Sequence, residues 1–148
     1  MYNIKFLKYN DSEYAKVKAI RTAVFTKEQG ADADCEFDGY ENSADFLLLY
    51  DSGQAVATSR VIKNEKGYKI GRIAVLKEYR GKGYGAVIVR AVTEKAFENG
   101  ADKVYVDAQN HAVPFYEKLS FTVIGEELID RGLVHTPMMI EKEKYYGS

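Results

Sequence analysis

The spacing of apolar residues in the first part of the chain predicts a strand followed by a helix. Residues 3–9 alternate apolar and polar side chains, which favours a strand. From a cap at Asp11 or Ser12 to about Glu28, apolar residues recur every three or four positions, as they do on one face of a helix. The stripe that we expect to be buried consists of Tyr14, Val17, Ile20 and Val24.

Three segments in the middle of the chain predict antiparallel strands. Residues 46–50 form a continuous apolar run, which indicates a strand buried on both faces. Residues 55–62 and 68–75 are the other two segments. The stretches between them, 51–54 and 64–67, are rich in Gly, Asn, Asp and Ser, which favour turns. Short turns of this kind join neighbouring antiparallel strands.

The third of these strands leads into a glycine-rich turn and a second helix. Glycines alternate with other residues from Gly81 to Gly85. Residues 86–98 then carry an apolar stripe at helical spacing, and Gly100 supplies a stop. Residues 103–107 form an alternating segment. Because a helix separates this segment from the previous strand, the two strands should pair in parallel.

The last part of the chain predicts a short helix and two more strands. Proline is tolerated in a first helical turn, so Pro114 indicates that the helix starts near Val113. Strands are expected at 121–124 and at 133–140, the second of them broken by Pro137, before a polar tail that frays. The whole pattern predicts an α/β fold, with a mixed, mostly antiparallel sheet flanked by helices on both faces.

Composition narrows the classes of protein that this chain can belong to. Its 148 residues predict one domain, and a formal net charge of -1 argues against binding to nucleic acid. A single cysteine, Cys35, excludes an internal disulfide and a cysteine zinc cluster. No apolar run approaches the roughly 20 residues that a membrane helix needs. The N-terminus does not resemble a signal peptide, so we expect a cytoplasmic protein.

An acidic connection follows the first helix. Between residues 28 and 45 the chain contains no lysine or arginine. One interpretation is a solvated loop whose charges repel one another. The other is a negative rim that attracts a cationic substrate, such as an amine or polyamine. Cys35 lies in this segment without a partner that would make it reactive. The acids are Glu28, Asp32, Asp34, Glu36, Asp38, Glu41 and Asp45.

The glycine-rich turn between a strand and a helix predicts an anion site, because backbone N–H groups at a helix start attract phosphate. A P-loop is excluded, since Gly-x-x-x-x-Gly-Lys-[Ser/Thr] does not occur. A dinucleotide site gains some support from Asp107, which ends the next strand where a ribose-binding acid would stand. However, the glycine spacing is Gly-x-Gly-x-Gly, and antiparallel hairpins precede the turn.

A third interpretation comes from a family resemblance. Arg80-x-x-Gly83-x-Gly85, with the strand Ile73-Ala74-Val75 before it, resembles the acetyl-CoA motif of the GNAT superfamily of N-acetyltransferases. The segment from Ala108-Gln109 through Tyr116 to Ser120-Phe121 is similar to the downstream segment of that family. Gln109 stands where the family usually has asparagine, and Ser120 where it usually has glycine. Narrower matches around Arg21–Gln29 and Gly132–Met138 resemble a branch of small bacterial GNAT proteins.

The resemblance covers nearly the whole chain and implies one acetyltransferase domain over residues 1–148, with the GNAT acyl-CoA N-acyltransferase fold. It implies acetyl-CoA as the acetyl donor, with the pantetheine arm between the splayed strands at 72–76 and 104–107. A backbone N–H near Val75 would polarise the acetyl carbonyl. No metal is expected. The residues expected to bind the donor are Ile73, Ala74, Val75, Arg80, Gly81, Lys82, Gly83, Tyr84, Gly85, Gln109 and Phe115.

The chemistry that follows is direct transfer of the acetyl group to a primary amine, on a small cationic molecule or on a lysine or peptide. Tyr116 matches the family tyrosine that donates a proton to the leaving thiolate. Glu28 and His135 are the candidates for the base. Two alternatives stay open: a non-catalytic acyl-CoA-binding module and, with less support, a nucleotide-binding oxidoreductase. An exposed edge strand near the C-terminus would allow a homodimer.

Overall fold

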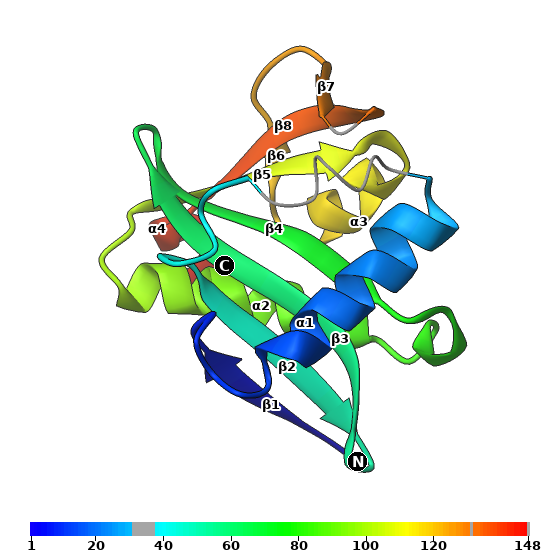
Figure 1. The fold of residues 1–148 in the computed structure, drawn as a ribbon. Coiled ribbons are helices and arrows are strands. Elements are labelled where there is room, and N and C mark those ends of the chain that lie inside the picture. Colours follow the sequence, from blue (N-terminus) through cyan, green and yellow to red (C-terminus); the bar gives the residue numbers. More distant parts are fainter. Residues whose placement is uncertain (31–37, 131, 148) are drawn as a thin grey trace.

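The computed structural model describes residues 1–30, 38–130 and 132–147. Within these residues eight strands form one mixed sheet, in the order β1-β2-β3-β4-β5-β8-β6, with β7 paired to β8 (Figure 1). All neighbouring strands are antiparallel except β4 and β5, which are parallel as the sequence predicts. The strands are β1 (Tyr2–Leu7), β2 (Asp45–Asp51), β3 (Gln54–Asn64), β4 (Gly67–Val75), β5 (Lys103–Gln109), β6 (Thr122–Val123), β7 (Leu128–Asp130) and β8 (Leu133–Glu141).

Helices cover both faces of this sheet. Figure 1 shows α1 in front of the sheet and α2 behind it. The α-helices are α1 (Tyr14–Arg21), α2 (Tyr84–Glu98), α3 (Val113–Lys118) and α4 (Lys142–Gly147), and the other helical segments are the π-helix η1 (Thr22–Glu28) and the 3-10 turns η3 (Lys77–Tyr79) and η4 (Asn110–Ala112). No helix among the described residues is long and apolar enough to cross a membrane.

The apolar run of β2 lies between two hydrophobic cores, one on each face of the sheet. Phe46 and Leu48 pack with the stripe of α1, whereas Leu47 and Leu49 pack with α2 on the opposite face. All four side chains are buried. Successive side chains of a strand point to opposite faces, so a strand that is covered on both sides needs an apolar residue at every position.

β4 contains the irregularity that opens the sheet. Thr58 of β3 pairs with Ala74, but Arg60 pairs with Gly71, so β4 has an extra residue at this point. Arg72 has a left-handed φ of 50°, a conformation that costs a side-chain-bearing residue about 1–2 kcal/mol. Such a bulge bends its strand and redirects a side chain. The parallel pairing of β4 with β5 stops at Ile70 and Val106, which leaves a gap between the two strands.

Three features differ from what the sequence predicts. The first long helix changes from α to π at Thr22, a form that apolar spacing does not distinguish. The expected break at Pro137 is wrong: β8 is continuous, and the Pro137 carbonyl accepts a hydrogen bond from the Ile124 N–H (3.0 Å). The polar tail forms α4, where the Tyr145 ring packs against Phe97 at a tilt, with ring centroids 5.6 Å apart.

Ser120 supports a stability prediction. Its φ is +76°, in the left-handed region, and it occupies the position where the resembled family usually has glycine. Glycine adopts this conformation without a Cβ clash. We therefore expect Ser120→Gly to raise the free energy of unfolding by about 0.5–1 kcal/mol in urea titration. The control Ser12→Gly relieves no positive φ and should bring no gain. Equal effects of the two substitutions would contradict this explanation.

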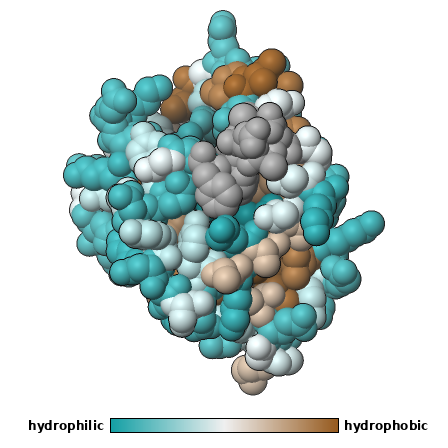
Figure 2. All heavy atoms as spheres, viewed as in Figure 1, coloured by the Kyte–Doolittle hydropathy of each residue, from teal (hydrophilic) through white to brown (hydrophobic). Residues whose placement is uncertain are grey.

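Hydrophobic side chains also gather at the end of the molecule that carries β7 and β8 (Figure 2). Ile129 is 75% exposed there and Val134 is 43% exposed.

Candidate active site

A cavity of about 710 Å³ lies where β4 and β5 separate. It brings together the glycine-rich turn, the ends of β4 and β5, the end of η1, and α3. All but one of the predicted site residues line it: Glu28, Ile73, Ala74, Val75, Arg80, Gly81, Gly83, Tyr84, Gly85, Gln109, Phe115, Tyr116 and His135. The exception is Lys82. Its Nζ lies 3.6 Å from Asp51 and over the Tyr79 ring, and its side chain is 53% exposed.

The glycine-rich turn forms one end of the cavity. Gly81 and Gly83 both adopt left-handed φ values, +84° and +82°, and Gly83 is the N-cap of α2. The first helical hydrogen bond runs from the Val87 N–H to the Gly83 carbonyl. The N–H groups of residues 84–86, in the first turn of α2, therefore have no partner within the helix. N–H groups at the positive end of a 15-residue helix form a cradle suited to a phosphate group.

The exposed edge of β4 forms the middle of the cavity. The Leu76 N–H donates to the Val56 carbonyl on β3 (2.9 Å). N–H groups of successive strand residues point to opposite edges, so the Val75 N–H faces the side where β5 has diverged. Beyond Ile70, this edge of β4 has no β5 partner. It therefore offers hydrogen-bonding groups to an extended ligand such as a pantetheine chain.

Arg80 joins the turn to the first helical segment. Its guanidinium forms two hydrogen bonds with the Glu28 carboxylate (2.5 and 2.7 Å), and its Nε donates to the Val75 carbonyl (2.9 Å). The hydrogen bonds from Arg80 lower the pKa of Glu28 below its ordinary value, against a smaller opposing effect of burial. Glu28 is thus a carboxylate with weakened basicity, and Arg80 already has an anionic partner.

The ion pair between Arg80 and Glu28 leads to a prediction about the affinity for the donor. To contact a phosphate, Arg80 must exchange Glu28 for the ligand. An exposed ion pair is worth about 0.2–1 kcal/mol, so we expect Glu28→Gln to tighten binding of acetyl-CoA by up to about fivefold in calorimetry. Arg80→Gln should weaken binding, and Glu65→Gln, on the exposed turn between β3 and β4, serves as the charge-matched control. If Glu28→Gln leaves the affinity unchanged, Arg80 does not exchange partners.

Tyr116 lies in the wall of the cavity on α3. Its side chain is buried between Phe115 and Phe121, with ring centroids 5.1 and 5.6 Å away. Burial raises the pKa of Tyr116, because the phenolate would lose its hydration. The hydroxyl therefore stays protonated at neutral pH and is available as a proton donor.

Polar side chains cross the cavity near the end of β5. Gln109 Nε2 donates to Gln29 Oε1 (2.9 Å), which joins β5 to the residue that follows η1. His135 is buried on β8 opposite Gln109, and its Nδ1 lies 2.9 Å from the Leu133 carbonyl. Because a carbonyl only accepts, the Nδ1 of His135 carries the proton in this contact. His111 also lines this part of the cavity.

The described part of the acidic connection is neutralised by basic side chains, so the expected negative rim is not what these residues form. Asp38 binds Arg60, Glu41 lies 3.7 Å from Arg60, and Lys8 pairs with Asp45 (2.8 Å). Cys35, Asp32, Asp34 and Glu36 lie outside the described residues. Within the described ranges, no three His, Cys, Asp or Glu side chains form a group that could hold a metal ion.

Sequence reasoning overlooked Arg72, which also lines the cavity. The available signal was a charged residue inside the otherwise apolar strand segment 70–75. The same reasoning considered Asp107 only as a ribose ligand, although it lies at the strand gap.

Known proteins share this architecture. The sequence model of the acetyltransferase (GNAT) domain matches residues 9–142. An uncharacterized N-acetyltransferase of Bacillus subtilis (strain 168), YjcF, is 35% identical over 131 residues, which cover 88% of this chain and 94% of YjcF. Escherichia coli ElaA has a TM-score of 0.84 at 25% identity, with 95% of this chain and 100% of ElaA covered.

An acyl-CoA N-acyltransferase from Pseudomonas aeruginosa shares the fold, with a TM-score of 0.83 at 24% identity and with 94% and 99% of the two chains covered. This chain belongs to the GNAT acetyltransferase family. Its fold is the GNAT acyl-CoA N-acyltransferase fold, and the family assignment supports acyl transfer from an acyl-CoA to an acceptor.

Proposed function

We propose that the protein transfers an acetyl group from acetyl-CoA to a primary amine by direct attack within a ternary complex. The observation that carries this proposal is the cavity itself. It joins an anion cradle, an unpaired strand edge and a buried tyrosine hydroxyl, which are the groups that a CoA thioester and its leaving thiolate require.

The donor would lie along the cavity from the turn to the strand gap. Its pyrophosphate would bind the N–H groups that follow Gly83, with Arg80 as an added cation. The pantetheine arm would pair with the open edge of β4. The Val75 N–H would then donate to the acetyl carbonyl, whose oxygen gains negative charge when the amine attacks.

The transfer step moves two protons. The amine nitrogen forms a bond to the carbonyl carbon and loses a proton, while the carbon–sulfur bond breaks and the sulfur takes a proton as the CoA thiol. Tyr116 would supply the proton to sulfur. Glu28 and His135 are the two candidate bases, and Glu28 would act only after Arg80 has moved from its carboxylate to the donor phosphate.

A screen of amines tests the proposal. Purified protein and acetyl-CoA are incubated with amines, polyamines, aminoglycosides, free amino acids and peptides, and CoA thiol is measured. We expect thiol release that depends on both the protein and one class of amine. Calorimetry with acetyl-CoA runs in parallel. Tight binding of acetyl-CoA without thiol release from any amine would indicate a non-catalytic acyl-CoA-binding module instead.

A further inference from the structure

A second cavity of about 380 Å³ opens at the same strand gap and is not used by the donor site described above. It lies among β3, β4, β5 and β7. Gly71, Arg72 and Asp107 line both cavities, so the two meet where β4 and β5 separate. An acyl group that reaches the gap from the donor side would therefore be open to attack from this second cavity.

Two buried guanidinium groups form one wall of the second cavity. The side chains of Arg60 and Arg72 are only 5% and 7% exposed. Both bind the Asp38 carboxylate: Arg60 through Nη1 (3.1 Å) and Nη2, and Arg72 through Nη2 (3.4 Å). Buried cations are costly unless anions satisfy them, and the wall is built to hold a carboxylate.

The backbone conformation that places Arg72 in this wall is strained. Arg72 is the residue with left-handed φ in the β4 bulge, a conformation that glycine would adopt more easily. Gly71, directly before it, has no positive φ. Strained side-chain-bearing residues of this kind cluster at ligand sites. The strain indicates that this position serves the cavity through its guanidinium and not only through its backbone.

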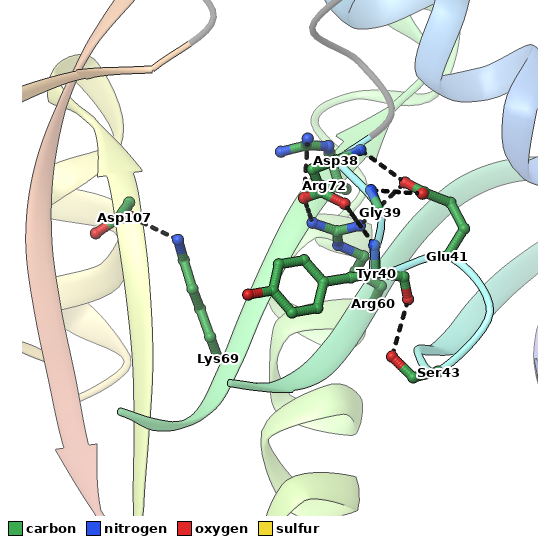
Figure 3. A network of polar contacts seen from close by, with 9 residues as sticks. All are labelled: Asp38, Gly39, Tyr40, Glu41, Ser43, Arg60, Lys69, Arg72 and Asp107. Carbon is green, nitrogen blue, oxygen red and sulfur yellow. Dashed lines mark hydrogen bonds and ion pairs between the residues drawn. The ribbon is translucent and has the colours of Figure 1, made fainter. Parts of the chain in front are cut away.

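The opposite wall carries charges of both signs. Asp107 and Asp130 line it, and Lys69 binds Asp107 (2.6 Å). Figure 3 shows Lys69 and Asp107 on one side and Asp38, Arg60 and Arg72 on the other. Each wall therefore contains an internal ion pair, Asp38 with Arg60 and Arg72 on one side and Lys69 with Asp107 on the other. A ligand with one charge of each sign can exchange with both pairs, its carboxylate for that of Asp38 and its ammonium group for that of Lys69.

We propose that this second cavity binds the acceptor, and that the acceptor is a small molecule with a carboxylate beside its primary amine, of the amino-acid class. This inference rests on the proposed function. The carboxylate takes the place of Asp38 at Arg72 and Arg60, and the amine takes the place of Lys69 beside Asp107, next to the strand gap. There the nitrogen attacks the thioester carbon, the carbon–sulfur bond breaks and CoA leaves as the thiol. The carboxylate requirement replaces the earlier expectation of a cationic acceptor.

Matched pairs of acceptors test the proposal with the unaltered protein. Each free amino acid is compared with the amine that lacks its carboxylate, for example leucine with 3-methylbutylamine, at saturating acetyl-CoA. CoA thiol release gives kcat/KM for both members. We expect the amino acid to be preferred at least about tenfold, the size of a charged hydrogen-bonded contact. Equal rates, or a preference for the decarboxylated amine, would overturn the carboxylate site while leaving acetyl transfer intact.

A substitution at Arg72 tests whether this residue causes the preference for acceptors with a carboxylate. Arg72→Gln should lower the ratio of kcat/KM for the amino acid to kcat/KM for the decarboxylated amine at least about tenfold. Arg90→Gln, on the exposed side of α2, is the matched control and should leave this ratio unchanged. A uniform loss for both acceptors would contradict carboxylate recognition by Arg72.

The failures of the two proposals are distinguishable. Absence of thiol release with every amine in the panel would overturn acetyl transfer itself. If Arg72→Gln fails to fold, as thermal unfolding would reveal, the comparison of matched acceptors with the unaltered protein still decides the question.

Discussion

Replacing Tyr116 by phenylalanine should lower kcat for acetyl transfer at least about a hundredfold, because a positioned general acid contributes about 10²–10⁴-fold. The substitution removes one oxygen and keeps the ring that packs between Phe115 and Phe121. The affinity for acetyl-CoA, measured by calorimetry, should stay the same, since the phenolic proton is needed only when sulfur leaves.

The matched control is Tyr145→Phe. It also removes a tyrosine hydroxyl, but one that donates to Glu94 (2.6 Å), between α4 and α2 and outside the cavity lining. This variant should keep the full rate. An unchanged rate in Tyr116→Phe at saturating substrates would show that Tyr116 is not the acid.

Gly83→Ala should weaken the binding of acetyl-CoA about tenfold. A Cβ at Gly83 meets no atom within 4 Å, so the effect comes from the backbone and not from a clash. Alanine costs about 1–2 kcal/mol at the φ of +82°. Relief of that strain would shift the N-cap of α2 and move the N–H groups at the helix start away from the phosphate. Calorimetry with acetyl-CoA measures the loss of affinity.

Gly100→Ala is the control for that prediction. Gly100 has a φ of +111°, its Cβ would also meet nothing within 4 Å, and it follows the other end of α2. We expect both substitutions to destabilise the fold by about 1–2 kcal/mol, whereas only Gly83→Ala should weaken the binding of acetyl-CoA. An equal loss of affinity in both variants would mean that the loss reflects stability alone.

Much of the fold could be predicted because the local signals agree with the tertiary structure. The run from Phe46 to Tyr50 is apolar at every position because helices cover both of its faces. Pro114 lies in the first turn of α3, where its missing N–H is not needed. The bulge at Arg72 and the π-helix were not predictable, since both depend on how β4 and η1 pack against the rest of the molecule.

The candidate site also contains some features that local sequence predicts and others that it does not. The glycine spacing predicted the tight turn before α2, because Gly81 and Gly83 adopt left-handed φ values that favour glycine. The ion pair between Arg80 and Glu28 joins residues 52 positions apart, and no local pattern indicates such a pair. Local patterns likewise did not indicate the partner of Asp38, because Arg60 comes from β3.

The fate of an isotope-labelled acetyl group is the most direct test of the central claim. Acetyl-CoA labelled in the acetyl group is mixed with the protein and the amine panel, and the products are separated by mass spectrometry. We predict that the label moves to the amine nitrogen of one acceptor class in a one-to-one ratio with released CoA thiol. Label that stays on CoA, or that is recovered as free acetate at the same rate with and without amine, would contradict acetyl transfer.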